Sequence, residues 1–161
     1  MPYTMHVDGM DMIAQMLEKT GEAAQSIAAR ALYNGAGAVA DEISKEARGL
    51  QTSNAFWFAH GGKQRYPSPE EKRAVESAGL GIAKFRKTGN DVNTSIGYGG
   101  SGYCTINGKR KPIAVIANSI NSGTSFMKKQ PFIRKAATQS KTKATVEILN
   151  EVTRLVGEIM K

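Results

Sequence analysis

The chain has 161 residues, of which 40% are hydrophobic and 22% charged, and its net charge is +8. This length is typical of a single domain with its own core, so we expect residues 1–161 to form one domain. No apolar run is long enough to span a bilayer, and the opening residues MPYTMHVDGMDM lack the basic and apolar segments of a signal peptide, so neither membrane insertion nor export is expected. Cys104 is the single cysteine, which excludes an internal disulfide and fits a reducing compartment.

Charge is unevenly distributed along the chain. Residues 1–47 hold seven acidic and three basic residues, a net charge of −4, and the remainder carries +12. Between Phe126 and Lys143 there is no acidic residue and there are six basic ones, Lys128, Lys129, Arg134, Lys135, Lys141 and Lys143. Such a cluster fits either a surface that faces nucleic-acid phosphates or a helix face that pairs with an acidic protein surface. We favour the protein surface, because no stacking aromatic pattern is interleaved with these lysines, and a small basic nucleic-acid-binding protein is the alternative.

The N-terminal part, residues 8–49, is predicted to be helical. Asp8 is a candidate N-cap for a helix to about Lys19, with Met12, Ile13, Met16 and Leu17 facing inward. After a break at Thr20 and Gly21, a longer helix runs to about Arg48. Its apolar stripe consists of Ala28, Leu32, Gly35, Val39 and Ile43. Because Gly35 and Gly37 lower helix propensity, we expect another element to pack closely against the backbone there.

An aromatic cluster lies in the loop predicted for residues 50–67. It consists of Phe56, Trp57 and Phe58, among Gly, Ser and Asn residues. Exposed aromatics are typical anchors for a partner, but the same residues equally suit a loop that folds back over the sheet or the long helix. Both interpretations stay open at this point.

Residues 68–111 are predicted to form a short helix and hairpins. Ser68 and Glu71 form a capping box around Pro69, which indicates a helix that ends near Ala78. The segments GIAKFRK (81–87) and DVNTSIGY (91–98) are expected strands joined by a hairpin at residues 88–90, and YCTI (103–106) is a third strand before an Asn107-Gly108 turn.

Residues 112–160 are predicted to be helical. After Pro112, a helix is indicated by Ile113, Ile116, Ala117 and Ile120 at helical spacing. Gly123 stops this helix, and Pro131 suits the first position of the next one, which turns Phe132 and Ile133 inward. The expected fold is therefore α+β, with a long N-terminal helix and a C-terminal helix packed on a small antiparallel sheet.

No arrangement of residues in the sequence predicts catalysis. Gly97, Gly99 and Gly102 match G-x-G-x-x-G, but YCTI follows them where a phosphate site needs a helix N-terminus. His6 and His60 are far apart, and Cys104 has no neighbouring His or Cys, so it is expected to be a half-buried strand residue. We expect a protein that is not an enzyme and that needs no cofactor and no metal.

The run IANSINSGTSFMKKQPFIRKA, Ile116 to Ala136, resembles the corresponding stretch of the small tail-component proteins of long-tailed bacteriophages, also called tail-completion or head-tail joining proteins. In that family a Gly-Thr-Ser turn and a Pro-Phe-aliphatic-Arg run recur together. Residues 9–43, 79–86 and 141–161 resemble further segments of the same family, whereas residues 50–67 match none of it. Most of the chain is therefore covered by the resemblance.

The resemblance implies a structural virion protein, found in the phage tail or neck and in the host cytoplasm during assembly, and encoded by an active phage or a prophage. Its implied role is to complete the tail and join it to the head, as a ring of identical copies that forms alone or only on assembly. The implied partners are other neck and tail proteins, namely a head-completion, tail-terminator or tail-tube protein, with incidental contact to packaged DNA and no membrane. The candidate assembly residues are Gly123, Thr124, Ser125, Lys128, Lys129, Pro131, Phe132, Arg134, Phe56, Trp57 and Phe58. Phe132 fits two roles, a buried core residue or a surface anchor for a neighbouring subunit.

Overall fold

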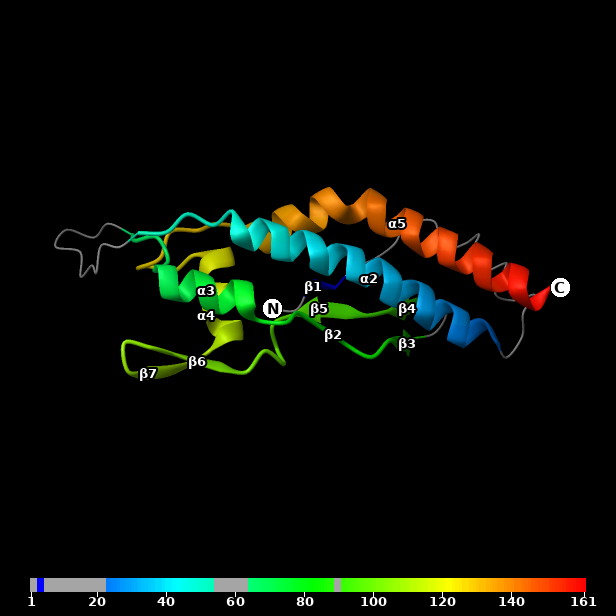
Figure 1. Ribbon diagram of the computed structural model, residues 1–161, viewed down its shortest axis with the longest axis horizontal. Helices are drawn as coiled ribbons and strands as arrows, with labels where there is room; N and C mark the ends of the chain where they lie inside the picture. The colour runs from blue at the N-terminus through cyan, green and yellow to red at the C-terminus, as the bar shows by residue number, and fades with distance from the viewer. Residues whose placement is uncertain (1–2, 5–22, 54–63, 89–90) are drawn as a thin grey trace.

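A computed structural model describes residues 3–4, 23–53, 64–88 and 91–161 (Figure 1). The described helices are α2 (Ala24–Arg48), α3 (Pro69–Ser77), α4 (Ile113–Ser122) and α5 (Phe132–Ile159). The strands are β1 (Tyr3–Thr4), β2 (Gly81–Ile82), β3 (Arg86–Thr88), β4 (Asp91–Asn93), β5 (Ser95–Gly97), β6 (Tyr103–Ile106) and β7 (Lys109–Pro112). This arrangement confirms the predicted α+β fold, with one long helix from each half of the chain and small antiparallel sheets. The helix predicted near residues 8–19 lies outside the described residues.

The two long helices, α2 and α5, pack side by side and run in opposite directions along the molecule (Figure 1). Gly35 lies at their contact, where a Cβ atom would be 2.5 Å from Ile148 Cγ1 and 3.2 Å from the Ala144 carbonyl oxygen. The close packing predicted from the two glycines is thus confirmed at Gly35. It is wrong at Gly37, where a Cβ atom would meet nothing within 4 Å.

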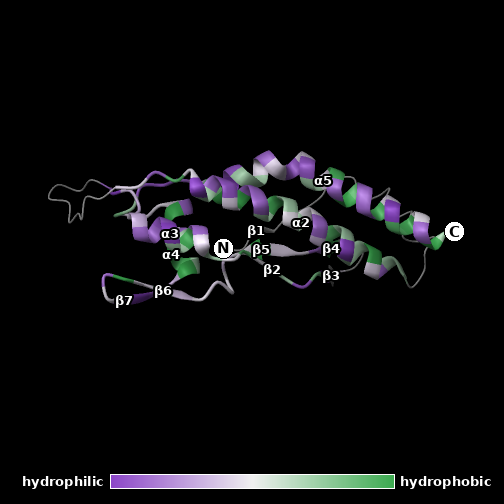
Figure 2. Cartoon of the chain, viewed as in Figure 1, coloured by the Kyte–Doolittle hydropathy of each residue, from purple (hydrophilic) through white to green (hydrophobic). Residues whose placement is uncertain are grey.

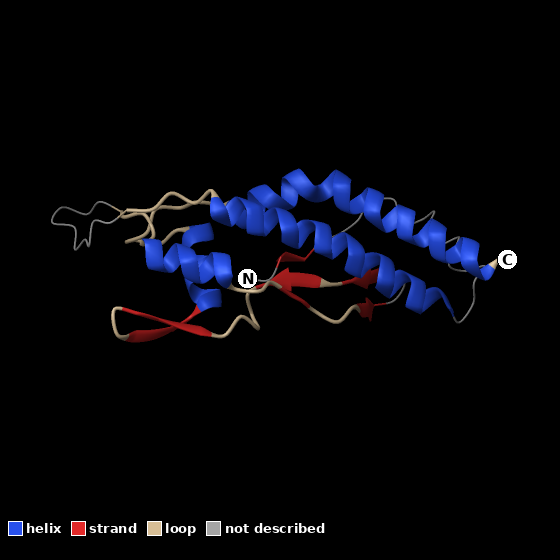
Figure 3. Cartoon of the chain, in the orientation of Figure 1, coloured by secondary structure: helices blue, strands red, loops and turns tan. Residues whose placement is uncertain are grey.

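Three small antiparallel sheets accompany the helices (Figure 3). In the first sheet β5 lies between β1 and β2. The other two sheets each have two strands, β3 with β4 and β6 with β7. Each of the two longer strands predicted for residues 81–87 and 91–98 is therefore divided in two. The first is interrupted at residues 83–85 and the second at Thr94. Thr94 is buried, and its hydroxyl donates a hydrogen bond of 2.6 Å to the Ala83 carbonyl oxygen. The turn residues 89–90 lie outside the described residues.

A single apolar core joins these elements. Hydrophobic and hydrophilic residues are interspersed along the long helices, as Figure 2 shows. It contains the predicted stripe of α2 and the predicted apolar face of α4, whose buried residues are Ile113, Ile116, Ala117 and Ile120. The same cluster includes Val75 of α3, Ile96 of β5 and Ile148 of α5. The helices therefore depend on one another for burial.

The β6–β7 hairpin has the predicted tight turn. Asn107 and Gly108 have φ angles of 51° and 71°, which are the left-handed conformations that a two-residue hairpin turn requires. Cys104 is half-buried, as predicted. Ile106, the last residue of β6, is buried in the core, so the hairpin is anchored directly beside its exposed turn.

Candidate assembly surface at the α4–α5 loop

The loop between α4 and α5, residues 123–131, begins at a glycine that cannot be replaced without strain. Gly123 has φ 76° and ψ 163°, a conformation accessible essentially only to glycine. A Cβ atom there would lie 2.9 Å from Lys129 Cβ. The chain therefore turns sharply and comes back against itself, as the Gly-Thr-Ser break predicts.

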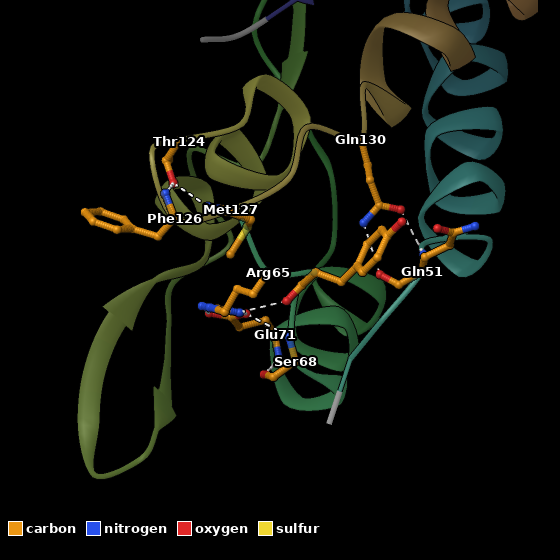
Figure 4. Close-up of polar contacts among 9 residues, drawn as sticks. Gln51, Arg65, Ser68, Glu71, Thr124, Phe126, Met127 and Gln130 are labelled. Carbon is orange, nitrogen blue, oxygen red and sulfur yellow. Dashed lines mark hydrogen bonds and ion pairs between the residues drawn. The ribbon is translucent and has the colours of Figure 1, made fainter. Parts of the chain in front are cut away.

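Thr124 holds the turn that follows (Figure 4). Its hydroxyl oxygen accepts hydrogen bonds from the backbone N–H groups of Phe126 (3.2 Å) and Met127 (3.0 Å), and its own N–H donates to the Met127 carbonyl oxygen. These bonds satisfy the backbone locally, so the loop has a defined shape without belonging to a helix or strand.

The loop is also bound to a segment that lies about 60 residues earlier in the chain. The N–H of Arg65 donates to the Phe126 carbonyl oxygen and the N–H of Lys128 to the Arg65 carbonyl oxygen, both at 2.8 Å. Gln64 Nε2 adds a bond of 2.6 Å to the Thr124 carbonyl oxygen. Two chain segments therefore brace each other through backbone hydrogen bonds, as in a short parallel bridge.

Arg65 is itself fixed by a bidentate ion pair. Its guanidinium donates to both carboxylate oxygens of Glu71, at 2.6 and 2.7 Å, and the N–H of Ser68 donates to the same carboxylate at 2.8 Å. Burial of Glu71 acts to raise its pKa, but the bonds from Arg65 and Ser68 and the charges of Arg65 and Lys111 hold that pKa below its ordinary value. The predicted capping box of α3 is present, and its Glu71 also positions the brace of the loop.

A pair of glutamines closes the other end of the loop. Gln130 Oε1 accepts from the N–H of Gln51 at 2.9 Å, and Gln130 Nε2 donates to the Gln51 carbonyl oxygen at 3.0 Å. The N–H of Gln130 also donates to the Ile120 carbonyl oxygen. The loop is therefore tied to the end of α2 as well as to α4.

Phe126 is the side chain that this framework presents. It is 75% exposed and points away from the braced residues (Figure 4), whereas the neighbouring Met127 is 5% exposed. Lys128 lies over the ring of Tyr66 and donates to its hydroxyl at 3.0 Å. The loop thus offers an aromatic side chain next to positive charge, on a backbone that is already ordered.

The predicted assembly residues fall into three groups. Those on the loop are Gly123, Thr124, Ser125, Lys128, Lys129 and Pro131, and exposed Arg134 follows in the first turn of α5. Pro131 is the N-cap of α5, so the helix starts one residue later than predicted. Phe132 is 3% exposed, and its ring centroid is 6.3 Å from that of Tyr98, so of its two possible roles the structure shows the buried one. The third group, Phe56, Trp57 and Phe58, lies outside the described residues.

Sequence reasoning missed Phe126, although a signal was present. Phe126 and Met127 are adjacent in a tight turn headed by Thr124, where two neighbouring side chains point in different directions, so an exposed apolar residue could have been expected. The bracing by Gln51 and Arg65 had no such signal, because these partners are distant in sequence and their residue types are common.

Neither a cluster of metal-binding side chains nor a membrane-spanning helix is present among the described residues. No group of three or more His, Cys, Asp or Glu residues among them could hold a metal ion. No described helix has the length and apolar character needed to cross a membrane. The chain matches no protein-family model, and no curated protein or solved structure is significantly similar to it.

Proposed function

We propose that this chain is a structural virion protein of the phage neck or tail, which completes the tail and joins it to the head. The proposal rests on the resemblance of residues 116–136 to the tail-completion family and on the kind of surface that these residues build. The Gly-Thr-Ser and Pro-Phe parts of that run are used internally, to shape the loop and to fill the core. What remains outside is a protruding contact surface.

The observation that carries the proposal is the exposure of Phe126 on a braced loop. A phenylalanine that is 75% exposed has most of its apolar surface available for a partner, and burying such a side chain is worth about 1.5–3 kcal/mol. Since the surrounding backbone is held by hydrogen bonds from Arg65, Thr124 and Gln130, little ordering entropy is lost on binding. An exposed aromatic in a preorganised loop has the properties of an interface anchor.

In this proposal, identical copies of the chain associate with one another into a ring. The negative net charge of residues 1–47 and the positive charge of the remainder favour head-to-tail contacts between copies, and such contacts close into a ring when the rotation allows. The neighbouring neck and tail proteins are the other partners.

The test is Phe126→Ala, with Tyr33→Ala as the matched control, because Tyr33 is also an exposed aromatic (61%) but lies on α2. Both purified variants should unfold within about 0.5 kcal/mol of the wild type, as is usual for surface substitutions. In phage carrying Phe126→Ala, electron microscopy should show separate heads and tails, and native mass spectrometry should show loss of the complex with the adjacent neck protein. Normal particles from Phe126→Ala phage would contradict the proposal. Equal defects in both variants would show that the α4–α5 loop is not the specific contact surface.

A further inference from the structure

The β6–β7 hairpin projects toward the same end of the molecule as the α4–α5 loop, away from the C-terminus (Figure 1). Within the described part of the chain it pairs with no third strand, so it forms a two-stranded ribbon. At its base the N–H of Ile113 donates to the Gly102 carbonyl oxygen at 3.0 Å. Ile106, which directly precedes the turn, is buried in the core. The hairpin is thus held at both ends, while the turn itself and the first residues of β7 are exposed.

The strand β7 is basic over its first three residues. Lys109 and Arg110 are exposed, and Lys111 is half-buried, close enough to Glu71 for its charge to lower the pKa of that carboxyl group. The Arg110 guanidinium lies 4.3 Å from the centroid of the Tyr103 ring, on the neighbouring strand. The ring holds the cation at the surface without neutralising it.

Lys109 and Arg110 of the ribbon, with Lys128 and Lys129 of the loop, form what we call the basic end. Over the described ranges, none of these four cations has a carboxylate within 4.0 Å, whereas Lys45, Lys135 and Arg154 are ion-paired along the long helices. Of the three acidic residues on nearby α3, Glu71 pairs with Arg65 and Glu76 with Lys72, and Glu70 is exposed. The charge of the basic end is therefore available to an external anion.

We propose that the basic end binds the phosphate backbone of duplex DNA without sequence preference. Unpaired lysines and arginines that project from two elements match a polyanion that extends past both, and each phosphate contact releases counterions. The sequence alone favours an acidic protein surface for the cluster that includes Lys128 and Lys129. In the structure these two lysines share the basic end with Lys109 and Arg110, and because lysine is depleted at protein interfaces, an acidic protein is the weaker match there. This inference goes beyond the assembly role and does not depend on it, because Phe126 takes no part in it.

The two tyrosines favour a duplex over a single strand. Single-stranded nucleic acid is bound by open aromatic faces on which bases stack. Here one face of Tyr103 is occupied by Arg110, and Lys128 lies 4.9 Å from the Tyr66 ring centroid. Each ring has a cation close to it; Tyr103 is still 59% exposed, but the cation reduces the area on which a base can stack.

The test is a salt titration of binding to a fluorescent 30-base-pair duplex of mixed sequence, measured by anisotropy. The wild type should show a linear fall of log K with log salt concentration. The variants Lys109→Ala/Arg110→Ala and Lys128→Ala/Lys129→Ala should each bind roughly tenfold more weakly at low salt and reduce the slope by about 2, because each lost phosphate contact contributes about 0.9. The α5 control, Lys143→Ala/Lys161→Ala, removes equal charge from α5 and from the residue that follows its C-cap, and it should leave the slope unchanged.

Three outcomes would overturn the proposal. The first is no salt-dependent binding by the wild type, and the second is an equal loss in the α5 control. The third is tighter binding of a single strand of the same length or of poly-glutamate, which would assign the surface to single-stranded nucleic acid or to an acidic protein. Phe126→Ala should keep the wild-type affinity for the duplex, so a failure of the assembly role and a failure of DNA binding can be told apart.

Discussion

At the scale of single residues, Phe132 is the side chain on which the start of α5 depends. It is 3% exposed, and its ring is tilted by 56° against that of Tyr98. Phe132→Ala should lower the free energy of unfolding by about 3–5 kcal/mol, through lost burial and the cavity left behind. Urea unfolding followed by circular dichroism measures the free energy of unfolding. Ile133→Ala is the control, and it should cause a smaller loss because Ile133 is only half-buried. A loss below 1 kcal/mol for Phe132→Ala would contradict the burial.

Tyr98 makes stability depend on alkaline pH. Burial raises the pKa of its hydroxyl to about 12, whereas in the unfolded chain that pKa is about 10. The contribution of the neutral hydroxyl is therefore fully present below pH 10 and is lost as pH rises toward 12. Between pH 9 and pH 11 the wild type should lose about 1.4 kcal/mol more than Tyr98→Phe, which has no group to ionise. Unfolding in urea at both pH values gives this difference, and a constant difference would show that the hydroxyl is solvated.

At the scale of elements, the contact between α2 and α5 distinguishes two glycines two residues apart. Gly35→Ala places a methyl group 2.5 Å from Ile148 Cγ1, and Ile148 is itself 1% exposed, so it should destabilise the protein by roughly 1–3 kcal/mol. Gly37→Ala meets nothing and should stabilise the protein by about 0.5–1 kcal/mol through helix propensity.

Thermal unfolding of both glycine variants tests this contrast. Adding Ile148→Val to Gly35→Ala removes one methyl group from the crowded site and should recover part of the loss. Equal effects of the two single substitutions would mean that the helices adjust their spacing freely.

The helices could be predicted from sequence because their signals are local. The Ser68 capping box, the Gly123 stop and the apolar spacing of α2 and α4 each lie within a few residues of the element they define. The strands could be predicted only in outline, because the break at Thr94 depends on a hydrogen bond to Ala83, eleven residues away. At the candidate surface, the turn itself was predictable and its bracing was not, since Gln51 and Gln130 are 79 residues apart.

At the scale of the whole molecule, one core links every described helix, so we expect a single cooperative unfolding transition. The exception is the β3–β4 hairpin, in which Val92 is only half-buried. Hydrogen exchange should therefore be slowest for the central amides of α2 and α5 and fast for β3 and β4. Equal protection of the β3–β4 and α2 amides from exchange would show that this hairpin unfolds only when the whole protein unfolds.

The pairing of α2 with α5 also determines when the core can form during translation. The ribosome completes α2 before it has made residues 49–131, and only then does α5 follow. Until α5 emerges, the part of the α2 stripe around Gly35 lacks the helix that covers it, and it is open to chaperones or to other nascent chains. Synthesis at lower temperature, or with more chaperone present, should for this reason raise the soluble yield without any change in the sequence.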